Sequence, residues 1–96
     1  MVFSILLMLA QGVSSNFVVT GDAGSCIRMM RQGQVWVAKN ICSVPVYASI
    51  TFRNPNNGRY NYASRDIAPY GDFYTNKGGV MQVHQIHAYR TGKGDL

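Results

Sequence analysis

The sequence predicts a small all-β protein, an antiparallel β-sandwich or partly open barrel of about six to seven strands. Two observations favour this class. Apolar and polar residues alternate with a period of two in the clearest segment, residues 44–53, as they do in a strand with one buried face. Clusters of Gly, Asn and Asp interrupt the chain at roughly the eight-to-twelve-residue spacing of such folds. With 96 residues, the chain forms one domain at most.

Residues 1–15 are predicted to be a signal peptide. Residues 3–10 are apolar and uncharged, and this run is shorter than the roughly 20 residues of a membrane helix. Residues 13–15 offer small side chains for cleavage before Asn16. Because no Lys or Arg precedes the run, an apolar first strand or helix is the alternative. The β domain would then cover residues 16–96, and we expect a secreted protein without a membrane span.

Cys26 and Cys42 are predicted to form a disulfide. An exported chain with an even number of cysteines typically pairs them. The predicted strands that carry them are separated by one short turn at Gly33, so the two residues should be neighbours. The alternative is a pair of reduced, buried thiols in a cytosolic protein.

The predicted strands follow one another closely. The first three are expected at residues 16–20, 26–31 and 35–40, with turns at residues 21–25 and 32–34. A fourth strand is expected at residues 44–53. One of its faces is predicted to enter the core and the other to face solvent. The expected core residues are Val44, Val46, Ala48, Ile50 and Phe52, and the expected outward residues include Tyr47, Ser49 and Thr51.

The second half of the chain is predicted to continue as hairpins. Asn57-Gly58 is a strong hairpin signal within a loop at residues 54–58, and a return strand begins at Arg59. Residues 67–71 are expected to be extended and then turn. A further turn is predicted at residues 76–79, followed by a last strand at residues 80–90.

Few residues suggest catalysis. His84 and His87 are three apart on a predicted strand, so they should point to opposite faces and could not easily share a metal ion. Asp66 and Asp72 are the only plausible pair of catalytic carboxylates, but both lie in turn-like sequence, where Asp commonly bonds its own backbone. We therefore expect no enzyme activity and no cofactor or metal. The alternative is a small secreted hydrolase or nuclease-type toxin that uses His84 and His87 or Asp66 and Asp72.

A Tyr- and Arg-rich hairpin is the candidate binding site. Tyr60 and Tyr62 share a face of one predicted strand, and aromatic rings beside hydrogen-bonding side chains suit a sugar or a protein partner. Arginines flank them at positions 53, 59 and 65. The candidate binding residues are therefore Arg53, Arg59, Tyr60, Tyr62 and Arg65. The alternative is that the hairpin is only a connector, whose tyrosines close off the core or form ordinary surface.

The net charge of +5 comes from nine Lys and Arg against four Asp, with no Glu. Such a charge favours weak attraction to anionic surfaces. The basic residues are spread along the chain rather than clustered, so no specific binding of nucleic acid is expected.

Three short motifs occur in order along the chain: Asn40-x-Cys42 followed by Pro45-Val46-Tyr47, then Ile67-x-Pro69-x-Gly71, and then Gly78-Gly79. Across Gly33–Leu96, the chain resembles the thaumatin-like domain of fungal secreted yeast-phase-specific, or antigenic thaumatin-like, proteins. The resemblance implies a secreted, non-enzymatic β-sandwich with no assigned ligand. The family usually continues further and pairs its first cysteine with a later one, whereas no cysteine follows Cys42. The chain would thus be a shortened and diverged member.

These patterns together predict a secreted, non-enzymatic binding protein, effector- or antigen-like, that acts on a host or cell-wall partner. The partner is expected to be a glycan or a protein.

Overall fold

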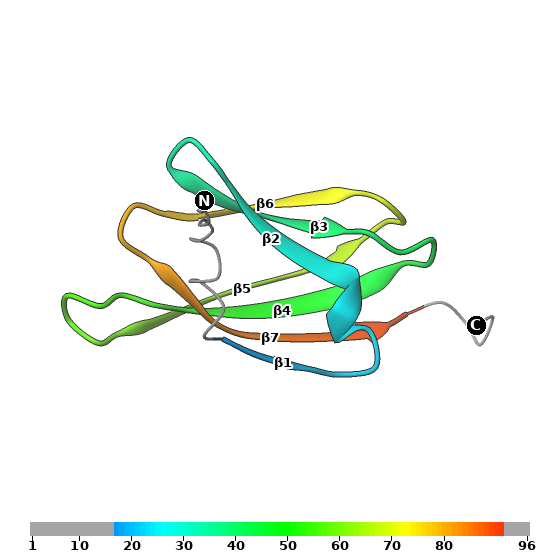
Figure 1. Cartoon of the computed structure of the whole chain (residues 1–96), viewed down its shortest axis with the longest axis horizontal. Helices are drawn as coiled ribbons and strands as arrows, with labels where there is room; N and C mark the ends of the chain where they lie inside the picture. The colour runs from blue at the N-terminus through cyan, green and yellow to red at the C-terminus, as the bar shows by residue number, and fades with distance from the viewer. Residues whose placement is uncertain (1–16, 92–96) are drawn as a thin grey trace, which may run out of the picture.

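The structure, a computed structural model, describes residues 17–91, which form strands in two layers (Figure 1). The predicted signal peptide lies outside these residues. Within them, no helix is long and apolar enough to cross a membrane. The elements in chain order are β1 (Val18–Thr20), the short 3-10 helix η2 (Gly24–Cys26), β2 (Ile27–Gln32), β3 (Val35–Asn40), β4 (Val46–Arg53), β5 (Tyr60–Ile67), β6 (Asp72–Gly78) and β7 (Gln82–Arg90).

The seven strands build two sheets, which confirms the predicted all-β sandwich. One sheet has the strand order β1-β7-β4-β5 and the other has the order β2-β3-β6. Neighbouring strands are antiparallel except for β1, which runs parallel to β7. Figure 1 shows β2, β3 and β6 in one layer and the remaining strands in the other. The sheets do not close into a barrel.

The core lies between the sheets, and β4 supplies its centre. Val46, Ala48, Ile50 and Phe52 are 0 % exposed, while the residues between them are only half-buried. This confirms the predicted register of β4. Val44, which precedes the strand, is half-buried and packs against the same core.

One end of the sandwich is closed by a disulfide between Cys26 and Cys42, which confirms the predicted pairing. Their Cα atoms are 5.3 Å apart. Cys26 precedes β2 and Cys42 follows β3, so the bridge joins the two connections that leave the smaller sheet at this end. The backbone adds to the closure, since the Ile41 N–H donates to the carbonyl of Cys26 at 2.8 Å.

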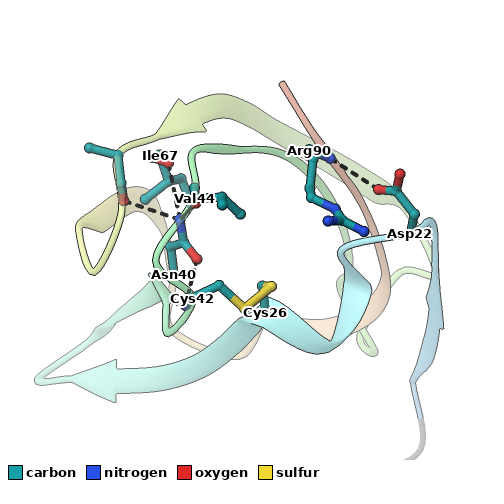
Figure 2. The surroundings of a disulfide bond; sticks show 8 residues. Asp22, Cys26, Asn40, Cys42, Val44, Ile67 and Arg90 are labelled. Atoms are coloured by element: carbon teal, nitrogen blue, oxygen red, sulfur yellow. Dashed lines mark hydrogen bonds between the residues drawn. A yellow bond between two sulfur atoms is a disulfide. The ribbon is translucent and has the colours of Figure 1, made fainter. Parts of the chain in front are cut away.

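The side chain of Asn40 holds the connections at this end together (Figure 2). It is 0 % exposed. Its Nδ2 donates to the carbonyls of Val44 (2.8 Å), Ile67 (3.2 Å) and Ala68 (3.1 Å), and its Oδ1 accepts from the Cys42 N–H at 2.9 Å. Buried polar groups need such partners. One amide therefore satisfies carbonyls of the β3–β4 and β5–β6 connections.

The segment after β1 is also tied to β7. The Ala23 N–H donates to the carbonyl of Ala88 at 3.0 Å. Asp22 accepts a bond from the Arg90 N–H at 3.0 Å (Figure 2). Gly21 has a φ of +91°, and a Cβ there would lie 2.0 Å from the Ala88 oxygen. Only glycine permits this close approach.

The predicted turn at residues 76–79 is wrong at its start, because β6 continues through Gly78. Asn76 adopts a φ of +61°, and the register between β3 and β6 shifts between Val35 and Val37. Because of this irregularity, β6 can include residues of the types that are typical of turns. The return strand β5 likewise extends to Ile67, beyond its predicted beginning at residues 59–63.

Candidate binding surface

The outer face of the four-stranded sheet carries a group of aromatic side chains. The alternation that buries Ile50 and Phe52 turns their neighbours in β4 outward. The register of β4 with β5 and β7 then decides which side chains lie beside them on this face. We call this surface the aromatic face and define it by Tyr47, Tyr60, Tyr62, His84, His87 and Tyr89.

Tyr60, Tyr62 and His84 gather near the β4–β5 loop. In the register, Tyr60 is opposite Arg53 and Tyr62 is opposite Thr51. The Tyr60 and His84 rings have centroids 5.0 Å apart in an edge-to-face arrangement. Tyr60 is 46 % exposed and Tyr62 is 65 % exposed. The alternative that these tyrosines only cover the core therefore does not hold.

A β-bulge brings His84 to this face. Thr51 pairs with Gln85 and Phe52 pairs with Val83, so His84 is an extra residue in β7. With regular alternation, His84 and His87 would lie on different faces of the sheet, as the sequence predicted. That expectation was wrong, because the extra residue resets the alternation. The contact of His84 with Tyr60 places its ring over the outer face.

A second aromatic group lies toward the disulfide end. Tyr47 and Tyr89 are register partners on β4 and β7, and their ring centroids are 5.4 Å apart. The His87 ring lies 6.0 Å from that of Tyr89, and its Nδ1 is 2.8 Å from the Thr20 hydroxyl of β1. Pairs of rings at such distances attract one another. This aromatic group therefore spans β4 and β7, and a hydrogen bond to Thr20 ties it to β1.

Hydroxyl and amide side chains share the two middle rows of the aromatic face with His87 and Tyr62. Ser49 and Ser64 face each other across β4 and β5, and their hydroxyl oxygens are 3.2 Å apart in a hydrogen bond. In the next row, Thr51 has Gln85 as its partner on β7. The middle of the aromatic face thus combines rings with hydroxyl and amide groups.

Charged residues lie at the two ends of this sheet face. Arg53 is opposite Tyr60 at the loop end, and Asp66 is opposite Tyr47 at the disulfide end. The two middle rows of β4, β5 and β7, at Ser49 and Thr51, contain no Lys, Arg, Asp or Glu. The net positive charge of the chain therefore does not gather on the aromatic face.

The structure brings together only some of the candidate binding residues. Arg53, Tyr60 and Tyr62 share the aromatic face, and Arg59 is exposed in the loop just before β5. Arg65 belongs to the opposite face of β5, because its guanidinium lies 5.4 Å from the ring centroid of Phe73 in the other sheet. Arg65 is thus separated from the two tyrosines.

The two carboxylates considered for catalysis point away from each other. Asp66 lies on the outer face of the larger sheet, opposite Tyr47. Asp72 belongs to β6 in the smaller sheet, where its Oδ1 lies 3.4 Å from Nζ of Lys39. Side chains that face outward from opposite layers cannot flank one scissile bond.

No group of three or more potential metal ligands occurs within residues 17–91. Both cysteines are oxidised and offer no thiol. His87 is hydrogen-bonded to Thr20, and the His84 ring meets the Tyr60 ring edge-to-face. Rings and hydroxyl groups are the groups that the aromatic face offers for contact.

Sequence reasoning missed Tyr47, His84, His87 and Tyr89 as members of this surface. The alternation of the sequence was the available signal for two of them. It shows that Tyr47 lies on the outer face of its strand and that Tyr89 shares a face with His87, two residues earlier. What the sequence does not show is that β4 and β7 are neighbours with Tyr47 opposite Tyr89.

Comparisons with protein-family models, curated proteins and solved structures found no match.

Proposed function

We propose that this chain is a secreted, non-enzymatic binding protein that recognises a host or cell-wall partner, glycan or protein, with its aromatic face. The observation that carries the proposal is the exposure of Tyr60 and Tyr62 beside His84 on the outer face of the larger sheet, a face on which no other described element packs. An effector- or antigen-like role follows from such an activity in an exported protein.

Exposed tyrosines on a sheet favour recognition for a physical reason. A tyrosine offers a flat apolar ring and a hydroxyl, and it loses little conformational entropy on binding. Tyr62 and Tyr89 keep 65 % and 43 % of their surfaces exposed although both belong to strands with a packed inner face. Residues of this type dominate many interfaces energetically.

The scaffold supports the proposal as well. The disulfide between Cys26 and Cys42 favours an oxidising compartment. Asn40 and the paired core positions of β4 hold the larger sheet rigid beneath the aromatic face, and a rigid scaffold lowers the entropy lost on binding. The resemblance to thaumatin-like domains stays a prediction.

The alternative of a hydrolase or nuclease-type toxin has weaker support. Asp66 and Asp72 face outward from opposite sheets, and His84 and His87 are engaged by Tyr60 and Thr20 respectively. A general acid and a general base must reach the same reacting group.

The experiment is a binding screen of the folded protein with matched variants. The labelled parent, the double variant Tyr60→Ala/Tyr62→Ala and the control Tyr74→Ala are applied to arrays of glycans and of extracellular proteins. Tyr74 is a suitable control because it is 52 % exposed but lies on the other sheet. We expect ligands of the parent to be lost by the double variant and kept by the control.

Equal binding by the parent and a folded double variant would show that recognition lies elsewhere. Release of products from polysaccharides or RNA by the parent, abolished by His87→Ala, would instead establish the enzymatic alternative.

A further inference from the structure

We infer that the ligand of the aromatic face is a neutral glycan chain that lies along β4, with sugar rings against the tyrosines at both ends of the face. This inference rests on the proposed binding function and names its ligand class. It follows from the length of the face, from its charges and from the side chains between its two aromatic groups.

The two aromatic groups are spaced to contact an extended chain. Tyr47 and Arg53 are six residues apart in β4, which corresponds to about 20 Å along a strand. Tyr89 lies beside Tyr47 at one end, and Tyr60 lies beside Arg53 at the other. One sugar ring cannot reach both groups, so the matching ligand is an oligosaccharide or polysaccharide.

The charges on the face select an uncharged ligand. Arg53 and Asp66 are of opposite sign and lie at opposite ends, while the rows at Ser49 and Thr51 are free of ionic side chains on β4, β5 and β7. A nucleic acid or an acidic glycan would require Lys or Arg along its path to neutralise it. Of the described basic residues, Arg53 lies at one end of this path, and the two middle rows carry neither Lys nor Arg.

The groups between the aromatic ends match sugar hydroxyls. Ser49, Ser64, Thr51 and Gln85 present hydroxyl and amide groups that can both donate and accept hydrogen bonds. A sugar ring has apolar C–H surfaces and hydroxyl groups at its edge. It therefore complements a protein surface on which aromatic rings lie next to hydroxyl and amide groups. Ser and Thr are under-represented among the energetically dominant residues of protein interfaces, and this favours a glycan over a protein partner.

Affinity electrophoresis of the full folded chain tests the inference. Native gels contain one soluble polysaccharide each: laminarin, hydroxyethyl cellulose, galactomannan or, as an anionic polymer, polygalacturonic acid. We expect retardation by at least one neutral polymer, with an affinity that changes less than about twofold between about 50 mM and 500 mM salt.

Single variants assign the binding to the two ends of the face. Tyr62→Ala and Tyr89→Ala should each weaken the affinity for the neutral polymer by about tenfold or more, whereas Tyr74→Ala should change it less than about twofold. In the parent, the bound polymer should protect Tyr62 and Tyr89 from nitration by tetranitromethane but leave Tyr70 and Tyr74 reactive. This measurement needs no variant and therefore does not depend on how well a variant folds.

The outcomes separate the inference from the proposed function. If only an anionic polymer or an arrayed protein binds, and Tyr60→Ala/Tyr62→Ala abolishes that binding, then the neutral-glycan inference is overturned and the proposed function stands. If a neutral polymer binds without protecting Tyr62 or Tyr89, then both are overturned. If nothing in either screen binds the parent, then both are likewise rejected.

Discussion

Ile50 of β4 and Ile86 of β7 are register partners in the middle of the larger sheet, and both are 0 % exposed. Each side chain points into the space between the two sheets. The aromatic face lies on the reverse of the same two strands, at Ser49 and His87. The packing of this pair therefore sets the spacing of the rows of the aromatic face on the other side of the sheet.

Ile50→Ala should reduce the free energy of unfolding by about 2–5 kcal/mol, because it leaves a cavity at a fully buried site. The control, Thr51→Ala, changes a half-buried neighbour on the outer face and should stay within about 0.5 kcal/mol of the parent. Urea unfolding of both variants measures the difference. A larger loss for Thr51→Ala than for Ile50→Ala would contradict the register of β4.

Removal of the disulfide with Cys26→Ala/Cys42→Ala should lower the free energy of unfolding by about 3 kcal/mol. The bridge closes a loop between residues 16 apart, and its loss frees the unfolded chain. Thermal unfolding with and without reductant measures the effect. The parent should lose stability in reductant, whereas the double variant should not respond to it.

Asn40→Ala should destabilise the fold by about 2–3 kcal/mol or more, since it leaves the Cys42 N–H and three carbonyls without their buried partner. Asn61→Ala is the matched control, because Asn61 is half-buried and, within the described residues, its side chain makes one long hydrogen bond, to the sulfur of Met81 at 3.8 Å. Denaturant unfolding should separate the two variants. Similar losses would mean that Asn40 does not hold the connections together.

Gly78→Ala should disrupt the pairing of β6 with β3, because a Cβ at this position would lie 1.6 Å from the Gln34 carbonyl oxygen. The adjacent Gly79 has a φ of +63° but open space around it, so Gly79→Ala should cost only about 1 kcal/mol of backbone strain. Unfolding midpoints of the two variants test this order. If Gly78→Ala is as stable as Gly79→Ala, the close approach is not present in solution.

Arg65→Ala should leave ligand binding within about twofold of the parent, because the Arg65 side chain packs over Phe73 rather than beside Tyr62. The binding gels described above measure this directly. A loss as large as that of Tyr62→Ala would place Arg65 in the binding surface after all.

Local patterns in the sequence predicted the parts of the fold that depend on neighbouring residues. The period-two alternation of β4 correctly identified Val46 to Phe52 as core, since burial of one face is read directly from parity. The short turn at Gly33 correctly made Cys26 and Cys42 neighbours. These features required no knowledge of which strands pair.

The candidate site was only partly predictable because it depends on register between distant strands. Tyr60 and Tyr62 share a face through parity alone, but their contact with His84 requires the bulge in β7 opposite Thr51 and Phe52. The prediction grouped Arg65 with the tyrosines because it is close to them in sequence. The alternation of β5 places it on the other face, where it lies over Phe73. Pairing of strands is set by tertiary packing, which a single sequence does not display.

The pairing of β1 with β7 has a consequence for the order in which the molecule folds. Thr20 meets His87 across 67 positions of the chain, and the following segment binds Ala88 and Arg90. During synthesis, β1 has no strand to join until β7 has been made, while the hairpins β2–β3 and β4–β5 can form earlier from local contacts. Contacts between such distant residues form slowly because a long loop must close first. We therefore expect β1 to dock late, as the step that completes the larger sheet beside His87.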